Sequence, residues 1–245
     1  MAYALRVNAQ DKESEGRQDD LFLTTQWSLI LGAWDGGETT QMRQLEALAK
    51  AYWKPLHAYA ERFAVDGEEP DDLVQGFFAK IMAKEGFGDI APERGRFRAF
   101  LLRSFRNHTV DRIRKARAAK RGGRAAESPI EEEITGSDEA ESAYDRAWAV
   151  SLADLSYSRL KESYASRGQD TVFEAISPFL TSMPEDGVYD EIASQLGMSR
   201  ASIATAVTRM RARYGQLLKN EVGRTVAEAG EIENELRYLV SLISQ

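Results

Sequence analysis

Apolar residues recur every three or four positions along most of the chain, and stretches that alternate apolar with polar residues are scarce. This period is typical of amphipathic α-helices rather than of β-strands. We therefore predict an all-α protein with two helical domains. In the first half of the chain, helices are expected from about Thr24, from about Thr40 to Phe63, over 70–84 and from Phe97 past Ile113. In the second half they are expected near 141–166, 170–181, 186–196 and 199–222, and from about Glu231. Pro55 is expected to kink or divide the second helix, because proline cannot donate the backbone hydrogen bond of a helix interior.

The third expected helix has one wide apolar face and one polar face. The spacing of its apolar residues places them together in a core; they are Leu73, Val74, Phe77, Phe78, Ile81 and Met82. Asp71, Asp72 and Gln75 point away from that face. The two aspartates suit the positive end of the helix dipole and a surface that docks on another protein. Together with Glu68 and Glu69 they could alternatively bind a divalent cation, as in a nuclease.

The net charge of −7 conceals a strong separation of charge along the chain. Residues 94–124 hold twelve Arg and Lys residues and one acidic residue, a net +11, whereas residues 127–145 hold eight acidic residues and no basic one. Such a basic density is typical of polyanion binding. Phe97, Phe100 and Phe105 lie among the arginines, which favours melted nucleic acid because bases stack on aromatic rings. The alternative is a solvated charged helix, and some of these rings must belong to a core.

The change of sign falls in a segment that carries Gly122, Gly123 and Pro129 and lacks apolar periodicity. We expect residues 118–140 to be a flexible charged linker between two helical domains. Its acidic stretch is interpreted either as a solvated tether or as a segment that imitates nucleic acid. Residues 1–20 are expected to form a disordered N-terminal segment.

The composition excludes several classes of function. Without cysteine the chain has no disulfide, thiolate zinc site or cysteine nucleophile, and two histidines leave little for a histidine-bound metal. Phosphate-cradling, hydrolase and dinucleotide-binding motifs are missing, no apolar run could span a bilayer, and residues 1–20 lack the apolar core of a secretory signal. We therefore expect a cytoplasmic protein that is not an enzyme and has no catalytic residue, metal or cofactor.

A helix-turn-helix pattern extends from Tyr189 to Val207. Gly197 permits a left-handed turn and Ser199 can cap the second helix. The inward residues are expected to be Ile192, Ala193 and Leu196, followed by Ile203, Val207, Met210 and Tyr214. The residues expected to face a DNA groove or its phosphates are Arg200, Ala201, Ser202, Thr205, Thr208, Arg209, Arg211 and Arg213. The alternative is a helical hairpin with a solvated basic face.

The order of these elements resembles that of a bacterial RNA polymerase sigma factor of the extracytoplasmic-function (ECF) subfamily. Residues 69–78 resemble the part of sigma domain two that docks on the clamp helices of the polymerase β′ subunit. This implies a polymerase contact by Asp71, Asp72, Leu73, Gln75 and Phe78. Residues 94–114 resemble the region that melts the promoter and captures a flipped base of the minus-10 element. The residues implied there are Arg96, Phe97, Arg98, Phe100, Arg103, Asn107 and Arg114.

Residues 189–214 resemble sigma domain four, which binds the minus-35 element. The resemblance implies domain two over 21–117, a linker over 118–140, domain four over 141–225 and an amphipathic C-terminal helix over 226–245. The implied partners are promoter DNA and the RNA polymerase core, through the β′ clamp helices and the β subunit, with no membrane. Residues 25–29, 51–56 and 231–242 resemble a longer subgroup with a C-terminal extension. Several of its members are associated with Ser/Thr kinases, so an anti-sigma factor or such a kinase is a further candidate partner.

Two features depart from the minimal family pattern. Gly76 stands where an acidic residue is common, and the tail beyond residue 225 is additional. The tail is amphipathic, and its apolar side is expected to carry Ile232, Leu236, Leu239, Val240 and Ile243. We interpret it as a structural brace or as a regulatory latch on one sigma domain. The alternative functions for the whole chain are a free-standing helix-turn-helix transcriptional regulator and a metal-dependent nuclease built on Asp71 and Asp72.

Overall fold

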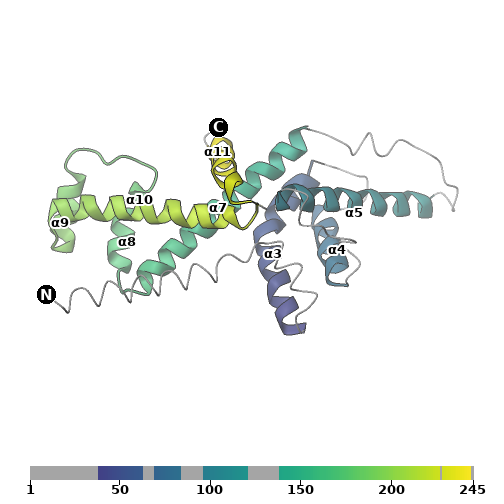
Figure 1. Cartoon of the computed structure of the whole chain (residues 1–245), viewed down its shortest axis with the longest axis horizontal. Coiled ribbons are helices and arrows are strands. Elements are labelled where there is room, and N and C mark those ends of the chain that lie inside the picture. The colour runs from purple at the N-terminus through teal and green to yellow at the C-terminus, as the bar shows by residue number, and fades with distance from the viewer. Residues whose placement is uncertain (1–37, 63–68, 84–95, 121–137, 227, 244–245) are drawn as a thin grey trace. The chain divides into compact units, whose positions relative to one another are not determined.

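The computed structural model describes residues 38–62, 69–83, 96–120, 138–226 and 228–243, which are helical and contain no strand. The predicted all-α fold is confirmed for these residues. The elements are α3 (Glu38–Ala60), α4 (Pro70–Met82), α5 (Phe97–Lys120), α7 (Asp138–Ala165), α8 (Asp170–Ile176), η2 (Ser177–Phe179), α9 (Val188–Leu196), α10 (Arg200–Gly223), η3 (Ala229–Glu231) and α11 (Ile232–Ile243) (Figure 1). The expected segment 1–20, the helix from Thr24 and most of the linker, 121–137, lie outside the described residues.

Two prolines act differently from one another. Pro55 lies inside α3, which continues to Ala60, so of the two expected effects, a kink or a division of the helix, the division does not occur. The helix expected over 170–181 ends at Ile176, and η2, which contains Pro178, follows it. Proline removes one helical hydrogen bond, and its ring presses on the preceding turn. The long helix α3 has enough other hydrogen bonds to continue through Pro55, whereas the short helix α8 ends before Pro178.

The chain divides into two compact units. Unit 1 comprises the described residues up to Ser151 and those from Val222 onward, and unit 2 comprises Leu152–Glu221. We predicted a division within residues 118–140, whereas the structure divides the chain inside α7. The physical reason is the first half of α7, where Ala140, Tyr144 and Trp148 are completely buried and therefore belong to the core of unit 1.

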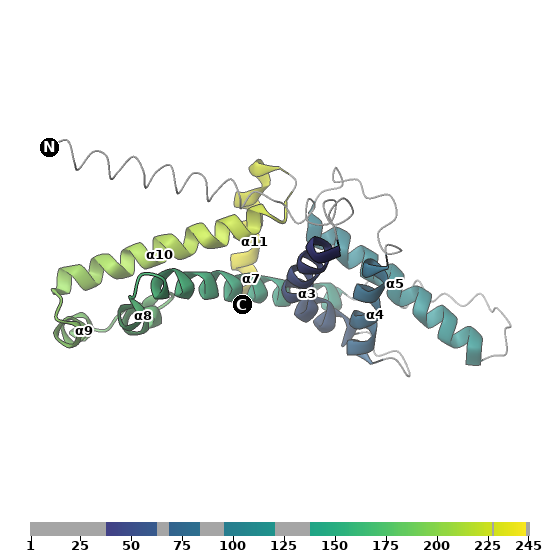
Figure 2. The same ribbon diagram turned by 90° about the horizontal axis from the view of Figure 1, so that it is seen from below.

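Aromatic side chains from three helices form much of the core of unit 1. Phe105 of α5 packs edge-on against Tyr59 of α3 and Phe77 of α4, with ring centroids 6.0 and 5.3 Å apart. Tyr52 packs edge-on against Phe97 in the same way, at 5.5 Å. Edge-to-face pairs of this kind add to the stabilisation that apolar burial provides. They hold α3 and α4 side by side against α5, as Figure 2 shows.

Unit 2 has a separate core built from α7, α8, α9 and α10. Its buried residues are Leu160, Tyr164, Phe173, Ile176, Ile192, Ala193, Ile203, Val207 and Met210. The expected turn between α9 and α10 is present: Gly197 has a left-handed backbone with φ of 63°, and the backbone N–H of Ser202 donates to Ser199 Oγ at 3.1 Å. The predicted inward face of α10 is therefore confirmed, and the opposite face is exposed.

Candidate functional site

The first turns of α4 present acidic and amide groups to solvent. Pro70 stands at the start of the helix, and the Asp71 side chain is 72% exposed. Asp72 and Gln75 are exposed as well. Asp71 Oδ1 lies 3.5 Å from His57 Nε2 of α3. These three predicted polymerase-binding residues share one accessible surface.

The two remaining residues predicted to bind the polymerase lie in the core. Leu73 is completely buried, and Phe78 is 7% exposed and stacks on Trp53 at a centroid distance of 6.0 Å. Their prediction as surface contacts is therefore not supported. Both side chains belong to the apolar stripe that fixes α4 against its neighbours, so they set the orientation of the exposed residues.

Gly76 of α4 faces the ends of two side chains of α5. A Cβ at this position would lie 2.7 Å from Arg112 Nη1 and 3.4 Å from His108 Nε2. Arg112 Nη1 donates to the backbone carbonyl of Asp72 at 3.3 Å. Burial, followed by the charges of Lys80 and Arg112, lowers the pKa of His108 to about 4. This histidine is therefore a neutral packing residue near pH 7.

The exposed stripe of α5 carries part of the predicted minus-10 set. Arg103, Asn107 and Arg114 are exposed and recur at helical spacing. Phe97 is completely buried, so its prediction as a nucleic-acid contact is not supported, and Phe100 is half-buried. The aromatic residues among the arginines thus serve mainly the core, whereas the polar residues between them are accessible.

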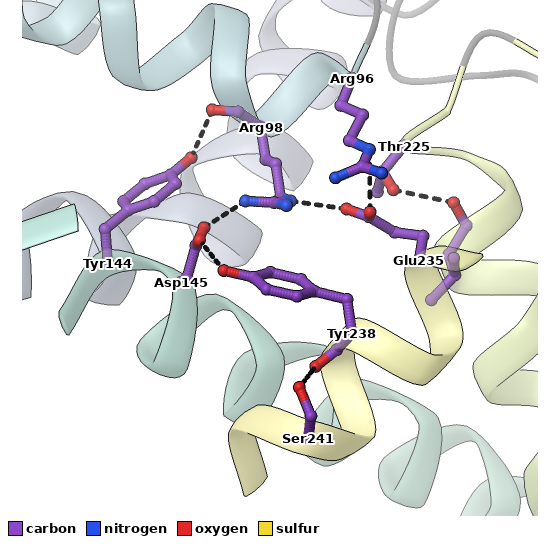
Figure 3. Close-up of polar contacts among 9 residues, drawn as sticks. Arg96, Arg98, Tyr144, Asp145, Thr225, Glu235, Tyr238 and Ser241 are labelled. Atoms are coloured by element: carbon purple, nitrogen blue, oxygen red, sulfur yellow. Dashed lines mark hydrogen bonds and ion pairs between the residues drawn. The ribbon is translucent and has the colours of Figure 1, made fainter. Parts of the chain in front are cut away.

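Arg98 also lies in the interior of unit 1, with 7% of its surface exposed. Its Nε donates to Glu235 Oε1 on α11 at 2.5 Å, and its Nη1 pairs with Asp145 on α7 (Figure 3). The rings of Trp148 and Tyr238 lie 5.0 and 4.8 Å from the guanidinium carbon. Arg98 is an internal ion-pairing residue in this structure, whereas the predicted DNA contact requires a surface residue.

One further residue, Arg96, completes this arrangement, which we name the Arg98 cluster. Its members are Arg96, Arg98, Asp145, Glu235 and Tyr238. Arg96 Nε lies 3.0 Å from Glu235 Oε2, and the Tyr238 hydroxyl donates to Asp145 Oδ2 at 2.5 Å. The cluster has two guanidinium groups and two carboxylates. Arginines bind carboxylates and phosphates by the same charge-assisted hydrogen bonds.

The charges of the cluster reinforce one another. Burial alone would lower the pKa of Arg98, but its hydrogen bond to Glu235 and the negative charges of Asp145 and Glu235 raise this pKa above its ordinary value. Burial and the hydrogen bond to Asp145 raise the pKa of Tyr238 to about 12. The guanidinium of Arg98 is therefore charged and the phenol of Tyr238 is protonated around neutral pH.

Asp145, Glu235 and Tyr238 are not among the functional residues predicted from the sequence. A signal for Glu235 was present, since it lies three positions after Ile232 and four before Leu239, on the side of α11 that we took to be apolar. The expected face is also rotated: Glu235 and Leu239 are buried, whereas Val240 and Ile243 are 53% and 47% exposed. A charged residue on an otherwise apolar face indicates a buried partner of opposite charge.

The outer face of α10 carries most of the predicted minus-35 set. These exposed residues are Arg200, Ala201, Ser202, Thr205, Thr208, Arg209 and Arg213. Arg200 Nε lies 3.4 Å from Asp190 Oδ2 on α9. Arg211 differs, because it is half-buried and donates to the backbone carbonyls of Phe179 at 2.8 Å and Ser182 at 2.7 Å. The guanidinium of Arg211 thus holds the turn after η2 instead of facing outward.

Neither a candidate metal site nor a membrane-spanning helix is present among the described residues. No group of three or more His, Asp or Glu residues in this part of the chain could hold a metal ion. Glu68, one of the four candidates for a cation site, lies outside it. None of the described helices combines the length and the apolar character needed to cross a membrane.

Comparison with known proteins gives one match. Residues 48–119, which include α4, nearly all of α5 and most of α3, match the family model of sigma-70 region 2. No curated protein and no solved structure gives a significant match to the chain. The matched segment contains both the exposed acidic surface of α4 and the exposed basic stripe of α5.

Proposed function

We propose, from the match of residues 48–119 to sigma-70 region 2, that this chain is an ECF-type sigma factor that directs the RNA polymerase core to promoters. The match supports a sigma-70 family sigma factor with a role in promoter recognition together with RNA polymerase. Members of this family are non-enzymatic transcription initiation factors, as the sequence analysis expected for this chain. The assignment of individual residues to polymerase and promoter contacts goes beyond this match and is our proposal.

The polymerase contact is assigned to Asp71, Asp72 and Gln75 on α4. The observation that carries the proposal is their exposure on the outer side of a helix whose inner side is completely buried. Exposed carboxylates at a helix N-terminus contribute about 1 kcal/mol or less to folding, so this surface is available for binding. The docking surface on the polymerase is the pair of β′ clamp helices, and the β subunit contacts the second unit.

The minus-10 contact is assigned to the exposed stripe of α5, chiefly Arg103, Asn107 and Arg114. Arginines at helical spacing can follow a phosphate backbone, and an exposed asparagine can donate to or accept from the edge of an unpaired base. Arg96 lies directly before α5, and its side chain is 37% exposed. Phe100 lies between this stripe and the core.

The minus-35 contact is assigned to α10. Ala201, Thr205 and Thr208 form a small, exposed face that fits a major groove, and Arg209 lies beside it. Arg200 and Arg213 supply exposed positive charge for phosphates at either end. A single helix binds a short DNA element only weakly. A protein that is held on the polymerase and binds two elements has a higher overall affinity, because binding at one element raises the effective concentration at the other.

Further partners follow from this role. A polymerase subunit acts in the cytoplasm, where the polymerase and the promoters are. An anti-sigma factor or a Ser/Thr kinase is the expected source of regulation, as the resemblance to the longer ECF subgroup implies.

The experiment is size-exclusion chromatography of the purified chain with RNA polymerase core. We expect co-elution, which Asp71→Ala combined with Asp72→Ala weakens about tenfold or more while the protein still folds. The matched control is Glu162→Ala with Glu174→Ala, which removes two exposed charges from unit 2. Equal binding of both double variants would contradict the assigned docking surface. A chain that ignores the core but binds duplex promoter DNA tightly would be a free-standing regulator.

A further inference from the structure

The C-terminal segment of the chain returns to the start of α5. The backbone N–H of Phe97 donates to the carbonyl of Thr225 at 2.9 Å, and α11 follows a few residues later. Glu235 of α11 is completely buried, although it is a carboxylate. Burial of a carboxylate is costly unless it is paired and hydrogen-bonded, and Arg96 and Arg98 supply this pairing.

The carboxylate of Glu235 lies against two guanidinium groups, as an arginine-bound phosphate does, with a hydrogen bond from Arg98 and an ion pair with Arg96. Its Oε1 lies 2.5 Å from Arg98 Nε and its Oε2 lies 3.0 Å from Arg96 Nε, so one anion bridges two guanidinium groups. Figure 3 shows both arginines directed toward this carboxylate. We propose that α11 is an internal competitor of nucleic acid, in which Glu235 occupies the arginines at the start of α5 that would otherwise bind a DNA phosphate. This inference rests on the proposed function, since it assumes that α5 binds DNA.

The attachment of α11 depends partly on charge. An isolated helix of 12 residues is not stable in water, so α11 requires its contacts with the rest of unit 1. Leu239 is its buried apolar residue, whereas Val240 and Ile243 are largely exposed. Ile232, Leu236 and Leu242 are half-buried, and Glu235 and Tyr238 add the charged and polar contacts of the Arg98 cluster. A polyanion that competes for the arginines therefore weakens the polar part of the attachment of the helix.

The two arginines respond differently when α11 leaves. Arg98 keeps its pairing with Asp145 and its contact with Trp148, both of which lie on α7. Arg96 loses Glu235, and its side chain is already 37% exposed. Arg96 is therefore the residue that gains a phosphate contact on release, and Arg98 is the residue that positions the start of α5.

The test measures binding of the full chain to a fluorescent oligothymidylate of about 20 nucleotides, by anisotropy at several salt concentrations. This probe requires neither a known promoter nor RNA polymerase. Glu235→Gln keeps the shape of the side chain and removes its charge, and Glu233→Gln removes the same charge from an exposed position on the same helix. We expect Glu235→Gln to bind about fivefold more tightly than Glu233→Gln, with a salt slope steeper by about 0.7, the value of one added single-strand phosphate contact.

A third variant identifies the arginine. Adding Arg96→Ala to Glu235→Gln should abolish the gain, and a gain that survives would overturn the proposal. Equal affinities and salt slopes for Glu235→Gln and Glu233→Gln would overturn it as well. If Glu235→Gln does not fold, as judged by circular dichroism, Tyr238→Phe keeps every charge and removes only the hydrogen bond to Asp145. It should then show a smaller gain, and no gain would refute the competition.

These outcomes differ from failure of the proposed function. A chain that does not associate with the polymerase core, yet gains oligothymidylate affinity through Arg96, would have the internal competitor without being a sigma factor. A chain that associates with the core, yet gains nothing from Glu235→Gln, would be a sigma factor whose α11 is a structural brace.

Discussion

His108 makes the stability of unit 1 depend on pH. Its ring lies between α4 and α5, against Phe77 at a centroid distance of 5.7 Å, and its Nε2 is buried without a hydrogen-bond partner among the described residues. Burial and the positive charges of Lys80 and Arg112 lower its pKa to about 4. In the unfolded chain the pKa returns to about 6.5, the ordinary value of histidine.

The sign of the effect follows from these two pKa values. Above about pH 6.5 His108 is neutral in both states and its full contribution to stability is present. As the pH falls toward 4, the unfolded chain takes up a proton that the folded chain does not, so the unfolded state is favoured. Two pKa values separated by about 2.5 give a loss of about 2 kcal/mol between pH 7 and pH 5, and about 1 kcal/mol if solvent screens half of the effect.

The assay is urea denaturation of the wild-type chain and of His108→Gln at pH 7 and pH 5. His108→Gln is expected to lose about 1 to 2 kcal/mol less than the wild type over this interval, whatever its stability at pH 7. The matched control is Asn107→Gln on the exposed side of α5, which changes no titratable group and should retain the wild-type dependence. Identical pH dependence of the wild type and His108→Gln would refute the reasoning.

Three further predictions concern stability and can be checked by thermal or urea denaturation. Arg211→Ala should destabilise unit 2 by about 1 to 2 kcal/mol, because the carbonyls of Phe179 and Ser182 lose their donor. The control Arg213→Ala should have no effect on stability. Equal effects of the two variants would show that the turn does not depend on the Arg211 guanidinium. Arg159→Ala should cost about 1 to 3 kcal/mol, since it removes an ion-pair partner of the buried Glu221, and an unchanged stability would contradict that pairing. Gly76→Ala should stabilise α4 by about 0.5 to 1 kcal/mol, because only the mobile end of an arginine must move, and a clear destabilisation would mean that this arginine cannot move.

Local patterns predicted much of the fold. Gly197 and Ser199 identified the turn before α10, because a left-handed glycine and a capping hydroxyl are determined by a few neighbouring residues. The same holds for the inner face of α10 and for the apolar stripe of α4, whose helical period is visible over a few turns. Met82 is the exception in that stripe: it was predicted in the core but is 44% exposed, because it is the last residue of the helix. The exposed Asp71, Asp72 and Gln75 followed directly from that stripe.

Long-range pairs could not be predicted in the same way. Arg98 and Glu235 are 137 positions apart, and nothing local distinguishes Arg98 from the exposed arginines of the same helix. The division of the chain inside α7 has the same origin, since the burial of Tyr144 and Trp148 depends on partners from distant segments. Charge density therefore indicated a basic helix correctly, but only the tertiary structure separates its surface arginines from its internal one.

The most direct test of the sigma factor assignment is transcription in vitro from a genomic promoter library by RNA polymerase core with and without the purified chain. We expect new transcripts that start downstream of a shared pair of sequence elements and that depend on the exposed residues Arg103 of α5 and Arg209 of α10. A core enzyme that binds the chain but starts no new transcripts, or starts them equally well without it, would contradict the account.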